Sequence, residues 1–316
     1  MTTAISMVGL TKHYKDVQAV TDLTLDVPAG TVYGFLGPNG AGKTTAMKVL
    51  AGLAQPTAGG ATVDGVPVSG AGDHRRHLGY LAQDPRFYGW MTGRETLRYV
   101  ARFRGADSRR EERISRLLER VGIADAADRR TSTYSGGMRQ RLGIAQALVG
   151  RPAVILLDEP VSSLDPIGRK AVLELMQELK GETTVFYSTH ILDDVQRVSD
   201  HVAILDHGRL IKAAPTHALL GSFTKNMLRV VLGGASTTTE AELRQLSGIA
   251  SASLVSHDGD EWAYAVTSDD HASDKVQAAI TRYAVDAGLT LIGNSEETLD
   301  LETVFLRLIE QKEVAA

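Results

Sequence analysis

Gly37-Pro38-Asn39-Gly40-Ala41-Gly42-Lys43-Thr44-Thr45 is the stretch of the chain that decides its fold. It matches the phosphate-binding loop pattern, in which Gly and four further residues precede Gly-Lys-Ser/Thr. The apolar residues 31–36 predict a buried strand before the loop, and residues 46–51 predict the start of a helix after it. Together these features predict an α/β fold that binds ATP or GTP.

The loop offers three kinds of contact to a phosphate chain. Its glycines allow successive backbone N–H groups to point at the phosphates, and the following helix adds its positive N-terminal end. Lys43 brings a full positive charge to the β- and γ-phosphates, and the Thr44 hydroxyl is suited to hold Mg²⁺. We therefore expect a nucleotide bound together with Mg²⁺.

Length and composition limit the possibilities. A chain of 316 residues is long enough for roughly two domains. It has no cysteine, which excludes disulfides and Cys-based metal sites, and it opens without the basic-then-apolar pattern of a signal peptide. No apolar run reaches the roughly 18 residues that a membrane-spanning helix needs. We expect a cytoplasmic protein, with any membrane-spanning part on another chain.

Charge is unevenly distributed. The net charge is −4, but residues 221–316 carry 15 acidic and 7 basic residues, which leaves a balance of +4 before them. Between Arg86 and Arg141 there are 14 arginines and 7 carboxylates. This segment is compatible with a nucleic acid, an anionic membrane face, or a solvated helical face with Arg–Glu pairs. Because the two signs are interleaved, we favour the solvated face.

The flanks of the predicted core contain two candidate site residues. Residues 5–10 and 21–27 alternate apolar and polar side chains, which predicts an antiparallel sheet at the edge of the domain. Tyr14 lies between these strands and could stack on a base, although a half-buried loop tyrosine is the simpler explanation. Gln83 lies at the end of the strand predicted at 78–84, where its side-chain carbonyl could reach a metal or a water.

A helical segment follows this strand. Capping boxes at Thr92 and at Ser108 predict two helix starts, and Trp90 before them is expected to pack. Ser135 can cap a third helix, at whose start Gly136 and Gly137 would expose N–H groups to an anion. The chain thus carries a second candidate phosphate site, which one active site on its own does not need.

Acidic residues follow the next predicted strand. The apolar run at 153–157 ends on Asp158 and Glu159. A carboxylate beside the phosphate loop is suited to hold Mg²⁺, the role expected for Asp158, which leaves Glu159 to polarise a water. Asp165 predicts the cap of the next helix. His190, after the strand predicted at 183–188, could donate to a γ-phosphate or serve as a structural histidine.

With these motifs in this order, the first ~220 residues resemble the ATP-binding subunit of an ABC transporter. Beyond the phosphate loop, the resemblance is carried by the glutamine loop at Gln83, the signature Tyr134-Ser135-Gly136-Gly137-Met138, Asp158 and Glu159, the loop Ser163-Leu164-Asp165, the switch histidine His190 and the upstream aromatic Tyr14. It implies an ABC-type P-loop NTPase domain at 1–220, with an antiparallel β edge subdomain and a helical subdomain at about 84–152.

The resemblance also implies chemistry shared between two subunits. ATP on the phosphate loop of one subunit, from Gly37 to Thr45, would be covered by the other subunit's signature, Ser135, Gly136 and Gly137. The nucleotide site would also include Tyr14, Gln83 and Asp165. For the reaction, the resemblance implies Glu159 as general base, His190 and Lys43 at the γ-phosphate, and Thr44, Gln83 and Asp158 around Mg²⁺.

The chain departs from the family pattern in two places. The signature usually reads Leu-Ser-Gly-Gly-Gln, but Tyr134 and Met138 stand at its ends, and Ser163 replaces a frequent glycine. Because the Ser-Gly-Gly core is intact, we expect ATP hydrolysis. This signature resembles that of bacterial exporters of drugs, antibiotics, lipids, polysaccharides or ions, whose membrane permease is a separate polytopic chain.

That resemblance sets the expected assembly. We expect an ATPase peripheral to the inner face of the cell membrane, whose segment 86–104 receives a cytoplasmic helix of the permease. A homodimer is the simplest assembly because both halves of the shared site are present on this chain, and a heterodimer remains open. No nucleic acid partner is expected.

The C-terminal segment has a different pattern. Strands and helices predicted between 227 and 292 follow a β-α-β-β-α-β order, which suits a small ferredoxin-like α+β domain at 225–316, closed by a helix at 301–308. This domain could bind a regulatory ligand, touch the membrane partner or support the dimer, and dimer support is favoured.

Two other functions remain open. One is a soluble ABC ATPase acting as a clamp on ribosomes or nucleic acid, although such relatives usually carry two ATPase cassettes or a long coiled coil. The other is an importer subunit.

Overall fold

The computed structural model describes residues 2–69, 72–103, 108–224, 227–268, 273–296, 300–306 and 308. The chain divides into two compact units, Met1–Thr216 and His217–Ala316.

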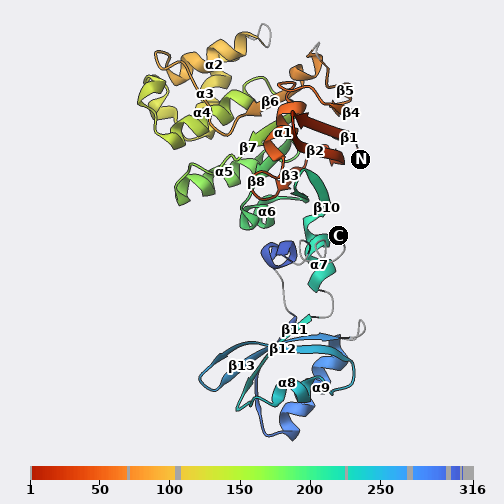
Figure 1. Ribbon diagram of the computed structural model, residues 1–316. Coiled ribbons are helices and arrows are strands. Elements are labelled where there is room, and N and C mark those ends of the chain that lie inside the picture. Colours follow the sequence, from red (N-terminus) through yellow and green to blue (C-terminus); the bar gives the residue numbers. More distant parts are fainter. Residues whose placement is uncertain are drawn as a thin grey trace. The chain divides into compact units, whose positions relative to one another are not determined.

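Unit 1 is built on a six-stranded sheet with the order β10-β9-β3-β8-β7-β6. Its strands are β3 (Val32–Leu36), β6 (Leu78–Leu81), β7 (Val154–Asp158), β8 (Thr184–Thr189), β9 (His201–Asp206) and β10 (Arg209–Pro215). All pairs are parallel except that between β9 and β10. Every residue of β3, β7 and β8 is buried, as in strands covered on both faces. The carboxyl ends of these three neighbouring strands therefore lie at one edge of the sheet (Figure 1).

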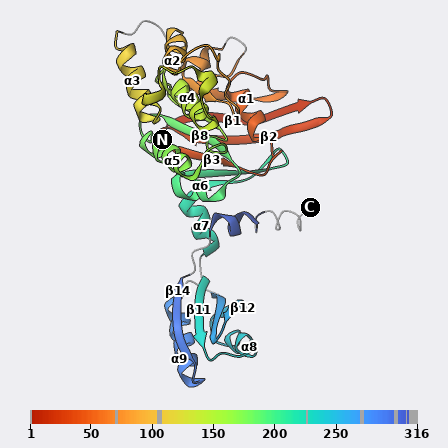
Figure 2. The same cartoon turned by 90° about the vertical axis from the view of Figure 1, so that its left-hand side faces the viewer.

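A second, antiparallel sheet has the order β2-β1-β4-β5 and confirms the predicted edge sheet. It contains β1 (Thr3–Tyr14), β2 (Val17–Pro28), β4 (Ala58–Val63) and β5 (Val66–Pro67). Figure 2 shows the long hairpin that β1 and β2 form. One apolar core joins this sheet to α1 (Lys43–Leu50) and to the six-stranded sheet, with Met7, Leu25, Phe35, Met47 and Phe186 among its fully or nearly fully buried members. The helix after the phosphate loop is thus fixed between the two sheets.

The helical segment contains α2 (Gly93–Arg102), α3 (Arg110–Arg120) and α4 (Gly136–Leu148), which lie together in Figures 1 and 2. The capping box at Thr92 is confirmed, because its hydroxyl accepts from the Glu95 amide at 3.1 Å while Glu95 accepts from the Thr92 amide at 2.8 Å. The box at Ser108 is wrong. Arg109 occupies the cap position without a side-chain cap, so the helix begins one residue too late for Ser108 to serve it.

Three further helices and three short 3-10 turns complete the elements assigned up to residue 224. They are α5 (Pro166–Glu178), α6 (Leu192–Val198) and α7 (Thr216–Thr224), with η1 (Asp73–Arg76), η2 (Ala124–Ala126) and η3 (Thr131–Thr133). The start of α5 is as predicted, since the Asp165 carboxylate accepts from the Gly168 amide at 3.0 Å and Pro166 occupies the first turn.

Unit 2 has the predicted order of elements. They are β11 (Met227–Gly233), α8 (Thr239–Leu243), β12 (Ile249–Asp258), β13 (Glu261–Ser268), α9 (Ser273–Asp286) and β14 (Thr290–Glu296). The strands form an antiparallel sheet with the order β12-β13-β11-β14. Leu228, Val230, Leu243, Tyr264 and Ile280 share its core, so α8 and α9 cover one face. Residues 301–306 are helical, and part of the predicted closing helix lies outside the described residues.

A core truncation in β7 should destabilise unit 1. Leu156 is fully buried in the strand that leads to Asp158, so Leu156→Ala removes packed methyl groups and should cost about 2–5 kcal/mol of unfolding free energy. Leu53→Ala, at a side chain that is 63% exposed, is the control and should change little. Urea unfolding followed by circular dichroism measures both, and equal midpoints would contradict this packing.

Candidate nucleotide site

The phosphate loop connects β3 to α1 and is closed around Lys43. Its ammonium donates to the backbone oxygens of Gly37 at 2.6 Å and Pro38 at 3.1 Å. Burial lowers the pKa of Lys43, while the nearby carboxylates of Glu159 and Asp158 act in the opposite direction. The lysine is therefore held inside the loop, at the N-terminus of α1, where an anion is favoured.

Two glycines of the loop are required by close approach of the backbone. A Cβ atom on Gly37 would lie 2.4 Å from the Leu205 carbonyl oxygen, and one on Gly42 would lie 2.2 Å from that of Ala19. Gly42 also has a φ of 97°, which other residues rarely adopt. The loop can keep this shape only with glycine at both positions.

Asp158, at the end of β7, connects α1 to β8. Its Oδ1 atom accepts from the Thr44 hydroxyl at 3.1 Å and from the Ser188 hydroxyl at 2.6 Å. Its Oδ2 atom is buried and has no hydrogen-bond partner among the described residues. A carboxylate oxygen in that state beside a threonine hydroxyl fits the oxygen ligands that Mg²⁺ prefers.

The backbone at Glu159 is strained. Its φ is 50°, a left-handed conformation that costs energy in a residue other than glycine. The Glu159 amide donates to the Ser188 hydroxyl at 3.0 Å, and the Glu159 carbonyl accepts from Ser162 at 3.1 Å and Gln140 at 3.4 Å. These bonds hold the turn in place.

The consequence of this turn is the direction of the Glu159 side chain. Its Oε1 atom lies 3.7 Å from the Lys43 ammonium, and its Oε2 atom lies 3.0 Å from Nδ1 of His190. Glu159 and Lys43 are both buried, so their contact is shielded from water, whereas the His190 side chain is 47% exposed. The structure thus brings together three residues that the sequence assigned to the reaction.

A cavity of about 570 Å³ lies over the phosphate loop, within the size range of small-molecule sites. Its lining residues are Val17, Gln18, Ala19, Asn39, Gly40, Ala41, Gly42, Lys43, Thr44, Thr45, Gln83, Glu159 and His207. Gln83 therefore faces the same space as Lys43, as expected. Tyr14 is not in this lining; it is 45% exposed at the end of β1, with the Lys12 ammonium 4.7 Å from its ring centre.

The signature lies at the start of α4, outside that lining. Ser135 caps the helix by accepting from the Met138 amide at 3.2 Å. A Cβ on Gly137 would lie 3.2 Å from Leu164, so the signature adjoins the loop that ends at Asp165. Asp165 is also absent from the lining, and its carboxylate caps α5. Within one chain the two candidate phosphate sites are therefore separate.

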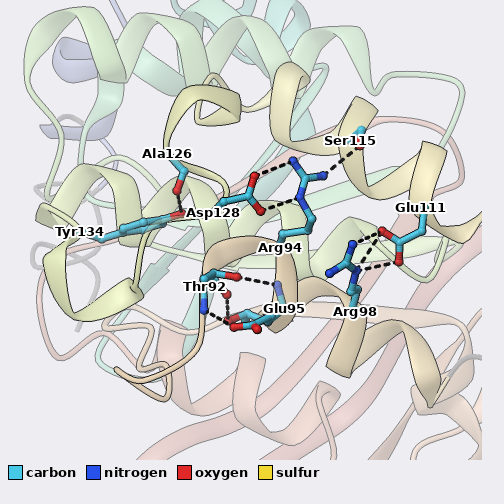
Figure 3. Close-up of polar contacts among 10 residues, drawn as sticks. Thr92, Arg94, Glu95, Arg98, Glu111, Ser115, Ala126, Asp128 and Tyr134 are labelled. Atoms are coloured by element: carbon cyan, nitrogen blue, oxygen red, sulfur yellow. Dashed lines mark hydrogen bonds and ion pairs between the residues drawn. The ribbon is translucent and has the colours of Figure 1, made fainter.

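Tyr134 anchors the signature from within the helical segment (Figure 3). Its buried hydroxyl donates to the Ala126 carbonyl at 2.7 Å, and its own carbonyl accepts from Arg139 at 2.6 Å. Burial raises the pKa of this phenol. A Cβ on Gly93 would lie only 2.3 Å from the phenol oxygen, so Gly93 makes room for it. The departure from the usual leucine thus adds a hydrogen bond without changing the Ser-Gly-Gly core.

Arginine–carboxylate pairs join the helices around the signature. Arg94 donates to Asp128 at 2.9 Å and to Ser115 at 3.0 Å, and Arg98 donates to Glu111 at 2.7 Å; Figure 3 shows how these side chains face one another. These pairs support the interpretation of the arginine-rich segment as a solvated helical face.

Two features could not be found from the sequence, one at the nucleotide site and one on the helical segment. Ser188 lies opposite Asp158 in the β7–β8 register, a pairing that only the order of strands in the sheet reveals. Trp90 was expected to pack but is 67% exposed, with its ring centre 5.8 Å from that of Tyr88. Tyr99 and Phe103 extend this exposed aromatic cluster.

The fold and the site define a P-loop ATPase, and comparisons with known proteins place it in a family. Residues 20–162 match the ABC transporter family model. The daunorubicin/doxorubicin resistance ATP-binding protein DrrA of Streptomyces peucetius is 38% identical over 311 residues, covering 97% of this chain and 92% of that protein. The bacitracin transport ATP-binding protein BcrA of Bacillus licheniformis is 38% identical over 218 residues, covering 68% and 71%.

Solved structures of ATP-binding cassettes have a similar fold. A solved ATP-binding subunit of an ABC transporter has 30% identity and a TM-score of 0.65, covering 70% of this chain and 93% of that chain. An ATP-binding cassette in a dimeric post-hydrolysis state, bound to ADP and Pi, has 26% identity and a TM-score of 0.63, covering 67% and 98%. The chain belongs to the ATP-binding proteins of ABC transporters and is an ABC ATPase. In the part of it that the structure describes, no helix is both long and apolar enough to span a membrane.

Filling the loop should weaken nucleotide binding. Gly42→Ala would place a methyl group against the Ala19 carbonyl and should weaken ATP binding at least about 10-fold, because the loop backbone must move. Gly40→Ala, also at positive φ but with open space around its Cβ, should weaken ATP binding less. Calorimetric titration with ATP measures both variants. Equal affinities would show that steric contact with Ala19 does not matter.

Proposed function

We propose that this chain is the ATP-hydrolysing subunit of an exporter for a drug or antibiotic. The observation that carries the proposal is its similarity to the daunorubicin/doxorubicin resistance ATP-binding protein, which extends over 97% of this chain and so includes unit 2. The bacitracin transport ATP-binding protein supports the same substrate class. Lipids, polysaccharides and ions are less well supported as substrates.

The proposed nucleotide site is the cavity over the phosphate loop. The loop from Gly37 to Thr45 binds the phosphates through the backbone N–H groups of its residues other than Pro38, and Lys43 contacts the γ-phosphate. Tyr14, exposed at the end of β1, is available to stack on the base. Thr44, Asp158 and Gln83 would hold Mg²⁺, which supplies positive charge to the phosphate oxygens when bound.

In the proposed reaction, Glu159 orients a water and accepts its proton. The water oxygen attacks the γ-phosphorus, the bond to the bridging oxygen breaks, and ADP leaves with that electron pair. His190, 3.0 Å from Glu159, orients the carboxylate and donates to the γ-phosphate. Burial of Glu159 beside Lys43 places these groups in an environment that strengthens electrostatic contacts.

We infer that two copies of the chain share each site. Ser135, Gly136 and Gly137 lie at a helix N-terminus that can bind an anion, yet they do not line the cavity of their own chain. A second copy in a head-to-tail arrangement would bring them onto the γ-phosphate, with Asp165 beside them. Since both halves are present on one chain, the proposed assembly is a homodimer.

The proposed membrane partner is a separate polytopic permease at the inner face of the cell membrane. Segment 86–104 is the surface proposed to receive its cytoplasmic helix. The exposed aromatic rings of Tyr88, Trp90 and Phe103 lie on that segment, and a hollow of about 340 Å³ lined by Arg86, Phe87 and Arg139 among others lies beside it. Aromatic and arginine side chains are those enriched where proteins bind each other.

For the domain organisation we propose an ATPase domain at 1–220, with a helical subdomain at about 84–152, and an accessory domain at 225–316. The sheet order β14-β11-β13-β12 with two helices on one face supports a ferredoxin-like fold for the latter. Its proposed role is support of the dimer.

Replacing the proposed base should separate binding from hydrolysis. Glu159→Gln keeps the shape of the side chain but cannot accept a proton, so ATP affinity should persist while turnover falls about 10²- to 10⁴-fold. Glu174→Gln, an exposed position on α5, is the control and should keep normal turnover. Near-normal turnover in Glu159→Gln would remove Glu159 from the role of base.

The membrane partner can be identified directly. Tagged protein, extracted from native membranes in mild detergent, should carry a stoichiometric polytopic chain, and ATPase activity should change when that chain is present. Recovery of only ribosomal or nucleic acid components would favour a clamp function, and a co-purifying periplasmic binding protein would favour an importer.

A further inference from the structure

Arg169 and the buried Asp194 form an ion pair that the proposed reaction does not use. The Arg169 Nε atom lies 2.9 and 3.1 Å from the two carboxylate oxygens of Asp194, and a terminal guanidinium nitrogen lies 2.8 Å from Oδ1. The Asp194 side chain is 1% exposed and that of Arg169 is 34% exposed. This fork geometry fixes the relative orientation of both groups as well as their separation.

The pair joins two helices, of which α5 is capped by Asp165 and α6 begins two residues after His190. Arg169 lies in the first turn of α5, where its amide donates to the Asp165 carbonyl at 2.8 Å. Asp194 lies in the first turn of α6, four residues after His190. The ion pair therefore connects the loop 163–165, which adjoins the signature, to the segment that carries His190.

Stability alone accounts poorly for such a pair. Removing an aspartate from water is costly, and apolar residues of similar size often stabilise a fold as well as a buried ion pair does. The first turn of α6 favours an acidic residue, but an exposed one would serve equally. What an apolar contact cannot supply is the fixed direction of a two-point hydrogen bond.

We infer that Arg169 and Asp194 are positioning residues that keep His190 on the Glu159 carboxylate. This inference rests on the proposed roles of Glu159 and His190. When the loop 163–165 meets the other subunit, the ion pair transmits the position of that loop to α6 and so to the His190 ring. Loss of the pair leaves the phosphate loop unchanged but misplaces His190.

The test replaces the pair with apolar residues of similar size, Arg169→Met with Asp194→Leu, so that no buried charge is left alone. We expect the KM for ATP to stay within about 2-fold of wild type while kcat falls about 10- to 100-fold, the loss typical of a misplaced catalytic group. The matched control is Lys170→Met with Glu174→Leu, which removes an exposed ion pair of 3.7 Å from the same helix.

A second comparison separates positioning from general disturbance. If the pair acts through His190, its removal should lower kcat little further in a His190→Ala background, so the two effects are not additive. The inference would be overturned if the two losses in kcat multiplied in the combined variant, or if the kcat of the apolar-pair variant equalled that of the control. Should the apolar pair fail to fold, Arg169→Lys serves in its place, since it keeps the charge but loses the fork. Absence of ATP hydrolysis in the wild type would instead refute the proposed function.

Discussion

The site depends on the hydrogen bonds that the Asp158 carboxylate accepts. This carboxylate receives hydroxyl hydrogen bonds from Thr44 in the first turn of α1 and Ser188 on β8, and so joins the phosphate loop to two central strands. Because β7 is buried along its whole length, the carboxylate cannot move without disturbing the core. The same rigidity places the next residue, Glu159, where its side chain reaches both Lys43 and His190.

The strain at Glu159 and the buried lysine show where stability is given up for function. A left-handed glutamate and a desolvated ammonium are both costly, and each is held by several hydrogen bonds from neighbouring segments. The helical segment differs, because arginine–carboxylate pairs at the surface and the buried phenol of Tyr134 add to an apolar core that includes Leu97, Ile114 and Leu118. Surface pairs of this kind orient helices more than they stabilise them.

Much of this arrangement could be predicted from the sequence, since short motifs carry their own geometry. The phosphate loop, the apolar run before Asp158 and the cap at Asp165 predict local structure that the chain adopts. Contacts between distant segments could not be predicted. The contact between Ser188 and Asp158 follows from the register of β7 and β8. The Arg169–Asp194 pair follows from the packing of α5 against α6, and the exposure of Trp90 follows from its neighbours in space. The predicted start of α3 was wrong, because Arg109 and not Ser108 occupies the cap position.

The proposed assembly binds one ATP between the phosphate loop of one copy and the signature of another. It is tested most directly by mixing two inactive variants, Lys43→Met and Ser135→Asp, the second of which keeps the helix cap but repels phosphate. Random pairing should give mixed dimers with one intact site, and single-turnover hydrolysis should return to about a quarter of the wild-type amplitude. No recovery in a mixture shown to contain mixed dimers would contradict the shared site.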